Sequence, residues 1–166
     1  MTCYIDTFAT PLGYFSIAVN EHNAVVATAF GSSPQLLRRL GKCHVIRDTF
    51  RLTPAREQVK EYFNGRRRSF DLALAPVGTV FQQRVWRALR RIHFGSTTSY
   101  GALAKKLARP GAARAVGRAN ATNPICLIIP CHRVIGADGA LTGFAFGEAI
   151  KRWLLEHEAS LGARAA

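Results

Sequence analysis

Apolar and polar residues alternate near the start of the chain in three short runs, at 4–8, 14–19 and 24–30. The breaks between them fall at 11–13, where Pro, Leu and Gly stand together, and at the polar segment 20–23. Alternation with a period of two is typical of strands that bury one face of a sheet. The pattern therefore predicts an antiparallel meander of three strands.

Two helices are predicted to follow this meander. The pairs at 33–34 (Ser-Pro) and 53–54 (Thr-Pro) each place a hydroxyl that can cap a helix directly before a proline suited to its first turn. Asn and Gly at 64–65 end the second helix. We expect a small α+β domain over residues 1–75, in which a small antiparallel sheet packs with helices.

A linker is predicted at 66–69 and 75–78, after which the pattern becomes helical. Thr79 can cap a helix whose apolar residues form one stripe, while most of its arginines fall on the other faces. The stripe comprises Phe81, Val85, Ala88, Leu89 and Ile92. A solvated basic face is the better interpretation of those arginines. A second, mainly helical domain is expected over 76–166.

Two further short helices are predicted inside that second domain. Ser99 can cap the first, which stops at Arg-Pro-Gly (109–111), and the second runs over 112–121. Two short helices across a tight turn favour a helix-turn-helix. The second helix is built mostly from Ala and Gly but carries Arg114 and Arg118, so it is thin enough for a minor groove about 6 Å wide. A small-residue helix packed tightly against a neighbour explains this composition equally well.

The segment 125–129 (Ile-Cys-Leu-Ile-Ile) is a continuous apolar run. Because the run is short and rich in β-branched residues, we expect a buried strand. This strand would end at the segment 130–135 (Pro-Cys-His-Arg-Val-Ile), with a turn at 136–139 behind it.

The net charge of the chain is +13 over 166 residues, and it is unevenly divided. Residues 1–75 hold 10 Lys/Arg and 6 Asp/Glu, whereas residues 76–166 hold 13 and 4. Clustered cations bind polyanions by releasing the counterions condensed on phosphates. Nucleic acid is therefore the expected partner, bound by the C-terminal half. Charge alone leaves DNA, RNA and an anionic membrane open.

The four cysteines show no CxxC spacing, which is typical of reduced thiols in a cytoplasm. The run 125–129 is the longest continuous apolar segment and is far shorter than the roughly 20 residues of a membrane span, so no membrane association is expected. Four scattered residues, Cys3, His22, Cys43 and His44, lack the paired spacing of a zinc site. We therefore expect no metal ion.

Cys131 is the candidate nucleophile. A cysteine attacks as its thiolate, which a neighbouring base or positive charge favours, and His132 and Arg133 follow it directly. Adjacent side chains of an extended strand point to opposite faces, so His132 would need a bend or a bridging water to reach the sulfur. Without further context, a lone Cys-His pair is more often two buried residues.

The context comes from the whole segment 123–136, which reads NPICLIIPCHRVIG. It resembles the active-site signature of the O6-alkylguanine-DNA alkyltransferases, also called methylated-DNA–protein-cysteine methyltransferases. The likeness spans about 76–161, where the segments 99–101, 111–117 and 154–158 match in order and spacing. The N-terminal 75 residues match only in general pattern.

The resemblance implies DNA repair by direct reversal. Cys131 would accept the alkyl group of O6-alkylguanine, and of O4-alkylthymine, irreversibly and once per molecule. His132 would be the general base acting through water, Glu158 would orient His132, and Asn123 would brace the site as a hinge. The C-terminal domain would be helix-turn-helix or winged-helix-like and would carry the active site. In the last predicted helix Glu158 continues an apolar stripe through Ile150 and Leu154, and a carboxylate there needs a partner such as His132.

The resemblance also implies double-stranded DNA as the partner of a monomer, with cooperative binding left open. Tyr100 would approach N3 of the guanine and assist its departure. Arg114 would fill the stack left by a nucleotide extruded through the minor groove, because O6 is out of reach of Cys131 within a duplex. Gly101 and Arg109 would contact the DNA backbone, and Arg118 is a further candidate DNA contact.

The expected alkyl pocket is lined by Val134, Ala145 and Phe146. Relatives usually have Tyr and Gly where this chain has Phe144 and Phe146, so we expect Phe146 to restrict bulky adducts. Ser96 also stands where many relatives have Glu.

Two other classes of protein stay open, and a third, a hydrolase, is disfavoured. A binding-only alkyltransferase-like protein would lack the acceptor cysteine. A helix-turn-helix regulator could use alkylation at Cys3 or Cys43 as a damage signal. A Cys-His hydrolase would rarely place both residues adjacent.

Overall fold

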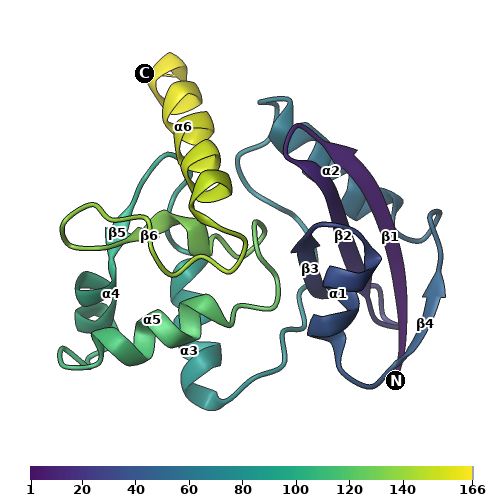
Figure 1. Cartoon of the computed structure of the whole chain (residues 1–166), viewed down its shortest axis with the longest axis horizontal. Helices are drawn as coiled ribbons and strands as arrows, with labels where there is room; N and C mark the ends of the chain where they lie inside the picture. The colour runs from purple at the N-terminus through teal and green to yellow at the C-terminus, as the bar shows by residue number, and fades with distance from the viewer. Residues whose placement is uncertain (166) are drawn as a thin grey trace. The chain divides into compact units, whose positions relative to one another are not determined.

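The computed structural model describes residues 1–165 as two compact units. The first is Met1–Val77 and the second begins at Gly78 (Figure 1). Within the first unit, the extended segment that leads to the boundary still belongs to the sheet, because Leu74 forms a parallel bridge with Val25. Each unit has its own apolar core.

The first unit is built on a four-stranded sheet with the order β3-β2-β1-β4. Its strands are β1 (Thr2–Thr10), β2 (Gly13–Val19), β3 (Val25–Phe30) and β4 (His44–Arg47). The predicted meander is confirmed, since β2 pairs antiparallel with both β1 and β3. The expectation of a wholly antiparallel sheet is wrong, because β4 pairs parallel with β1. With four residues and no buried one, β4 is too short to show an alternating pattern.

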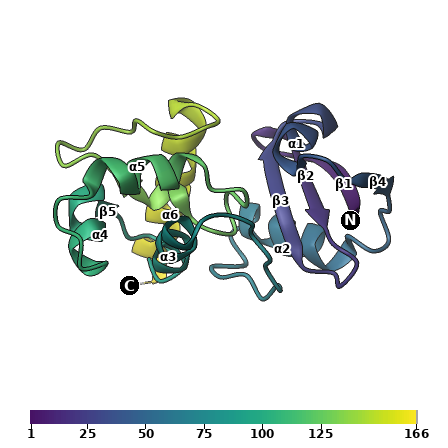
Figure 2. The ribbon, with the colours of Figure 1, turned by 90° about the horizontal axis from the view of Figure 1, so that it is seen from below.

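Two helices cover this sheet, α1 (Ser33–Leu40) and α2 (Thr53–Phe63), and they lie above and below it in Figure 2. Five successive residues of β2, 15–19, are buried, as expected for a strand covered on both faces. Both helices begin where the sequence predicts. The predicted capping is wrong, because the cap positions are Ser32 and Leu52 and neither side chain caps a backbone N–H.

The second unit is mainly helical. Its helices are α3 (Val80–Leu89), α4 (Tyr100–Lys106), α5 (Ala113–Ala121) and α6 (Glu148–Ala165), with one turn of 3-10 helix, η1 (Cys131–Arg133). Two short strands, β5 (Thr98–Ser99) and β6 (Val134–Ile135), pair in parallel. The structure thus has the α+β class predicted from the sequence, with a mixed sheet first and a helical unit second.

Local capping fixes where α3 and α4 start. Thr79 and Gln82 form a reciprocal capping box at α3, and the Ser99 hydroxyl accepts from the N–H of Ala102 at α4, so both predicted caps are confirmed. Buried Trp86 of α3 donates its indole N–H to the carbonyl of Ala119 at 2.8 Å, which anchors α5 against α3.

The apolar run 125–129 is buried as predicted, but it is not a strand. It folds into a tight turn in which Leu127 has a positive φ of 73° and Cys126 forms a bridge with Ile129. The side chain of Asn123 closes this turn. Its Nδ2 donates to the Ile129 carbonyl at 2.9 Å, and its Oδ1 accepts from the Ile125 N–H at 3.0 Å. The side-chain bonds supply what a neighbouring strand would otherwise provide.

None of the helices described over residues 1–165 combines the length and the apolar character required to cross a bilayer.

Candidate active site

Cys131 stands at the start of η1, directly after the buried turn, and is 5 % exposed. Its N–H donates to the Ile129 carbonyl at 2.8 Å, the same carbonyl that accepts from the side chain of Asn123. We name the two hydrogen bonds of that side chain the Asn123 clasp. The expectation of an extended backbone at Cys131 and His132 is wrong. A helical turn directs successive side chains around an axis instead of to opposite faces, and so supplies a bend of the kind that the sequence argument requires.

His132 is completely buried and pairs with Glu158 of α6, which is 1 % exposed. The two atoms that meet are His132 Nε2 and Glu158 Oε2, 2.7 Å apart. Because an ionised carboxylate can only accept, the ring donates from Nε2. His132 Nδ1 is then an acceptor, and it is buried without a hydrogen-bond partner among residues 1–165. The pairing expected for Glu158 is therefore present.

Arg133 completes this cluster in a way that the sequence did not reveal. Its Nε donates to Glu158 Oε1 at 2.8 Å and its Nη2 to Oε2 at 3.1 Å, the two-pronged geometry in which a guanidinium binds a carboxylate most strongly. Its Nη1 donates to the Ile92 carbonyl at 2.7 Å. Arg133 thereby joins η1, α6 and the turn that follows α3. We name His132, Arg133 and Glu158 the buried triad.

The buried triad sets the protonation of its members. Burial lowers the pKa of His132, and the charges of Arg133 and Lys151 lower it further against the opposing influence of Glu158. Burial alone would raise the pKa of Glu158, but hydrogen bonds from His132 and Arg133 hold it well below its usual range. At neutral pH the site therefore holds an ionised carboxylate, a neutral imidazole and a guanidinium.

Lys151 is a second buried cation that sequence reasoning missed. It is fully buried on α6, and its Nζ donates to the Val134 carbonyl at 2.6 Å and to the Thr142 carbonyl at 3.1 Å. Burial lowers the pKa of Lys151, and the neighbouring Cys131 opposes this effect. A cation that interacts with the Cys131 thiolate favours that charged form of the sulfur.

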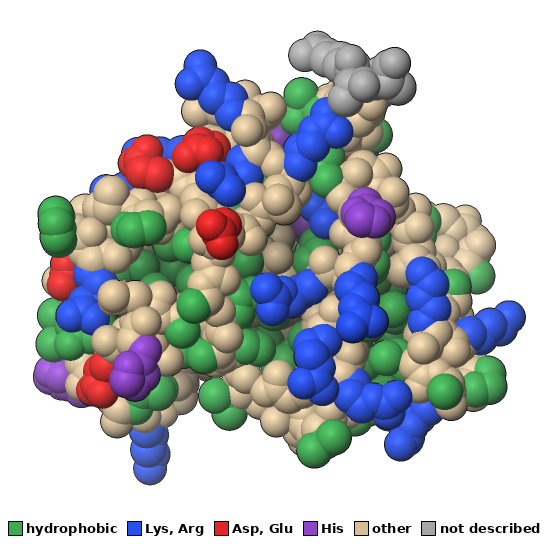
Figure 3. Space-filling model, turned by 180° about the vertical axis from the view of Figure 1, so that it is seen from behind, with side chains coloured by type: hydrophobic (Ala, Val, Ile, Leu, Met, Phe, Trp, Pro, Cys, Tyr) green, Lys and Arg blue, Asp and Glu red, His purple; other side chains and the backbone are tan. Residues whose placement is uncertain are grey.

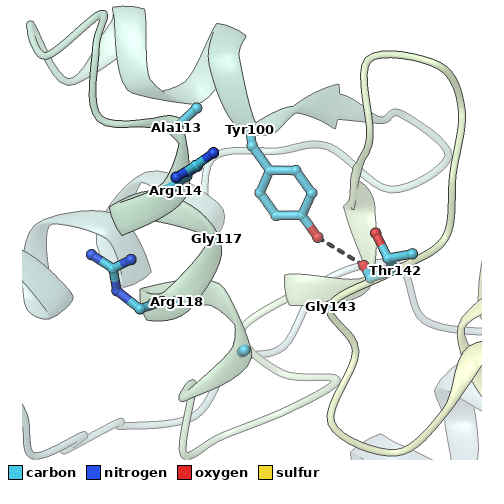
Figure 4. A pocket seen from close by; sticks show the side chains of 8 residues that line it. Tyr100, Ala113, Arg114, Gly117, Arg118, Thr142 and Gly143 are labelled. Carbon is cyan, nitrogen blue, oxygen red and sulfur yellow. Dashed lines mark hydrogen bonds between the residues drawn. The ribbon is translucent and has the colours of Figure 1, made fainter.

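A cavity of about 550 Å³ lies between α4, α5 and the loop before α6. Its lining includes Tyr100, Arg114, Arg118, Thr142 and Gly143. Figure 4 shows the Tyr100 ring between α5 and that loop, with its hydroxyl donating to the Thr142 carbonyl at 2.9 Å. A Cβ on Gly143 would come within 2.7 Å of this hydroxyl, so only glycine allows the approach. Burial and the nearby Cys131 raise the pKa of Tyr100, which keeps the hydroxyl a donor.

The other candidate residues lie outside this cavity lining. Gly101 follows Tyr100 on α4, and exposed Arg109 places its guanidinium 5.6 Å from the centre of the Phe81 ring. Val134 is fully buried on β6. Ala145 and Phe146 belong to the loop before α6, where Phe146 packs edge-on against Phe144 at 5.8 Å.

Positive charge gathers on the second unit. The space-filling view in Figure 3 shows many Lys and Arg side chains over it, and the cavity itself has Arg114 and Arg118 exposed on one helix. An exposed cationic helix beside a hollow suits a polyanionic ligand that inserts one group.

Comparison with known proteins covers nearly the whole chain. Residues 3–76 match the ribonuclease-like domain of 6-O-methylguanine DNA methyltransferase, and residues 80–160 match its DNA binding domain. The chain is 40 % identical over 163 residues to the methylated-DNA–protein-cysteine methyltransferase of Shigella flexneri, covering 94 % of this chain and 95 % of that one. The protein of that name from Mycobacterium bovis is 51 % identical over 119 residues, 72 % of each chain.

Solved structures agree with this match. The structure of Mycobacterium tuberculosis OGT in complex with DNA superposes with a TM-score of 0.86 at 41 % identity, covering 95 % of this chain and 94 % of that one. The O6-methylguanine-DNA methyltransferase of Pyrococcus kodakaraensis superposes with a TM-score of 0.65 at 25 % identity, covering 94 % and 98 %.

The buried triad predicts an acid-sensitive fold. The pKa values of His132 and Glu158 both lie below their ordinary values of 6.5 and 4.5, so at acid pH the unfolded chain binds more protons than the native one. Stability should therefore fall as pH drops below about 6.5, and more steeply below about 4.5, with each group adding up to roughly 1.4 kcal/mol per pH unit. Urea unfolding at successive pH values measures this.

Two variants test whether Glu158 causes the steeper loss of stability at acid pH. Glu158→Gln should be less stable than the native protein at pH 7, because Arg133 loses its counter-charge, but its stability should change less between pH 4.5 and pH 3. Glu148→Gln is the matched control on the same helix, since Glu148 is exposed and pairs only at the surface with Arg152. An unchanged acid slope in Glu158→Gln would refute the assignment.

Proposed function

Because the chain belongs to the 6-O-methylguanine DNA methyltransferase family, we propose that it repairs DNA by moving the alkyl group of O6-alkylguanine onto Cys131. The observation that carries this proposal is the buried triad next to Cys131, with the free Nδ1 of His132 inside it. Methylated-DNA–protein-cysteine methyltransferase is the activity that its relatives are named for.

The proposed reaction is an in-line displacement at the alkyl carbon. His132 Nδ1 takes the thiol proton of Cys131 through one water, while Glu158 holds the imidazole and neutralises the charge that it gains. Cys131 Sγ bonds to the alkyl carbon as the carbon–O6 bond breaks, and the electron pair leaves with the guanine. Lys151 stabilises the thiolate before attack.

The product explains why each molecule acts once. A thioether is stable, and the proposed site offers no group to hydrolyse it, so the alkylated protein is spent. Since the acceptor must be a free thiol, we place the reaction in the reducing cytoplasm. The protein acts as a monomer without metal or organic cofactor. Within residues 1–165, His, Cys, Asp and Glu side chains form no group of three or more suited to a metal ion.

Substrate delivery is assigned to the cavity beside α5. O6 is shielded inside a duplex, so the nucleotide must be extruded, and Arg114 fills the space that it leaves. Tyr100 then donates from its hydroxyl to N3 of the extruded guanine and supports departure of the anion. Gly101, Arg109 and Arg118 contact the DNA backbone, and O4-alkylthymine enters the same site.

The regulator alternative places the alkylated cysteine in the first unit, at Cys3 or Cys43, and burial of Cys3 argues against the first of these. Burial and the neighbouring Cys43 raise the pKa of Cys3 to about 11, so its thiol stays protonated and is a poor nucleophile.

The direct test follows the alkyl group. The protein is incubated with a duplex containing isotopically labelled O6-methylguanine, and the labelled peptide is located by mass. About one label per molecule on Cys131 is expected. Cys131→Ser should still bind the duplex but take no label, whereas repeated turnover without modification of the protein would overturn the proposal.

Arg114→Ala should slow transfer from a duplex by at least about tenfold, because the extruded state loses the side chain that fills the stack. Transfer from a single-stranded oligonucleotide, in which no base pair must open, should change much less. Arg152→Ala, which removes an exposed charge from α6, is the control. Equal slowing on both substrates would exclude the assigned role.

Phe146→Gly should widen the substrate range. The Phe146 ring packs against Phe144 in the loop that continues from the cavity wall at Thr142 and Gly143, where it restricts large adducts. The native protein should transfer benzyl more slowly than methyl, and the variant should raise the benzyl-to-methyl rate ratio about tenfold. Phe50→Gly, at a 90 % exposed residue of the first unit, is the control. Equal methyl and benzyl rates in the native protein would contradict the role given to Phe146.

A further inference from the structure

The segment 80–118 carries Lys and Arg but no Asp or Glu, and Asp71 and Asp138 are the nearest carboxylates along the chain on either side. Among residues 1–165, no Lys or Arg of this segment forms an ion pair. Helix α6 differs, since Arg152 pairs there with Glu148 one turn away. The fold therefore does not neutralise the positive charge of the segment 80–118.

Three of these arginines, Arg84, Arg87 and Arg91, share one side of α3. Steps of three and four residues return to the same side of a helix that has about 3.6 residues per turn. The helical course continues past Leu89, because the N–H of Arg91 donates to the Ala88 carbonyl at 3.1 Å. Arg87 and Arg91 are exposed, and Arg84 is half-buried. We name Arg84, Arg87 and Arg91 the α3 face.

The α3 face points away from α5, the helix proposed to enter the minor groove. The indole N–H of Trp86 bonds the Ala119 carbonyl of α5, and Val85 and Leu89 are buried near Trp86 on the same side of α3. Around the helix axis, these three residues lie more than about 120° from the centre of the α3 face. Because α5 packs against the inner side of α3, a duplex bound to the outer side of α5 does not reach the α3 face.

The end of α4 adds further cations beside the α3 face. Arg84 Nη2 donates to the carbonyl of Leu107, directly after α4, at 2.9 Å, so its guanidinium is held in place between the two helices. Lys105 and Lys106 are exposed on the last turn of α4, just before that carbonyl. Cations from two helices therefore surround one hydrogen bond, and Figure 3 shows Lys and Arg side chains gathered over this unit.

The spacing of the α3 face destabilises the isolated helix. Arg84 and Arg87 are three residues apart and Arg87 and Arg91 four, and like charges at these separations repel. A face that is only hydrated gains nothing from this repulsion. A row of phosphates turns it into attraction, because each bound cation releases counterions condensed on the nucleic acid. Arginine also suits phosphate, since its guanidinium can donate two parallel hydrogen bonds.

We propose that the α3 face is a second DNA-binding surface, which holds the phosphate backbone of a duplex segment other than the one bound along α5. Lys105 and Lys106 contribute to the same surface. It makes no base contacts, so it binds undamaged DNA of any sequence, and its affinity falls steeply with salt. One protein molecule thereby bridges two segments of DNA. The inference rests on the proposed function only for the duplex at α5.

The test measures whether a bound protein retains a second duplex. Cys131→Ser is bound to a short tethered duplex that contains O6-methylguanine, and a labelled, undamaged duplex is then added at several salt concentrations. The second duplex should be retained, with one protein for two duplexes. Adding Arg87→Gln and Arg91→Gln should weaken retention at least about tenfold and lower the slope of log affinity against log salt by roughly two. Arg38→Gln with Arg47→Gln, at exposed residues of the first unit, should leave both unchanged.

Three outcomes would overturn the inference. The first is no retention of the second duplex at low salt, which needs no change to the α3 face. The second is equal weakening by the two pairs of substitutions, which would show an effect of net charge alone. The third is two proteins for two duplexes, which would show contact between copies of the chain. Equal rates of methyl transfer in both pairs, made with Cys131 intact, check that they fold. Failure of the proposed function is separate, because Cys131 would then take no label while retention between two undamaged duplexes could still be measured.

Discussion

The second unit depends on one buried charge, the carboxylate of Glu158. At 1 % exposure an unpaired carboxylate would be too costly to keep ionised, and His132 and Arg133 satisfy both of its oxygens. Because Arg133 also bonds the carbonyl of Ile92, three segments that are distant in sequence are fixed around a single anion. The position of η1, and with it of Cys131, follows from that neutralisation.

The same arrangement determines the chemistry available at the sulfur. Arg133 balances the charge of Glu158, so burial can keep His132 neutral although a carboxylate lies 2.7 Å from it. A neutral imidazole that donates from Nε2 has its lone pair on Nδ1, where a base needs it. Lys151 adds a cation that interacts with Cys131 from α6, while the Asn123 clasp holds the turn before it.

The helix caps and the motif around Cys131 can be predicted from the sequence, whereas side-chain contacts between distant segments cannot. Thr79 and Ser99 cap their helices through neighbouring residues, so the sequence contains all that is needed to predict them. Glu158 stands on an apolar helix stripe, and a carboxylate in that position predicts a polar or charged partner. Arg133 and Lys151 gave no such sign, because their partners are carbonyls and side chains that only the tertiary structure brings together. The strand predicted at 125–129 is wrong because a buried strand and a buried turn closed by a side chain have the same continuous apolar sequence.

The central claim is that Glu158 acts on Cys131 through His132, and a double-variant cycle tests it most directly. Single-turnover methyl transfer from duplex O6-methylguanine is measured for the native protein, His132→Gln, Glu158→Gln and the double variant, each checked for folding. If the two residues form one relay, each single change slows transfer by roughly 10²- to 10⁴-fold and the double variant is no slower than His132→Gln. A double variant slowed by the product of the two single factors would contradict the relay.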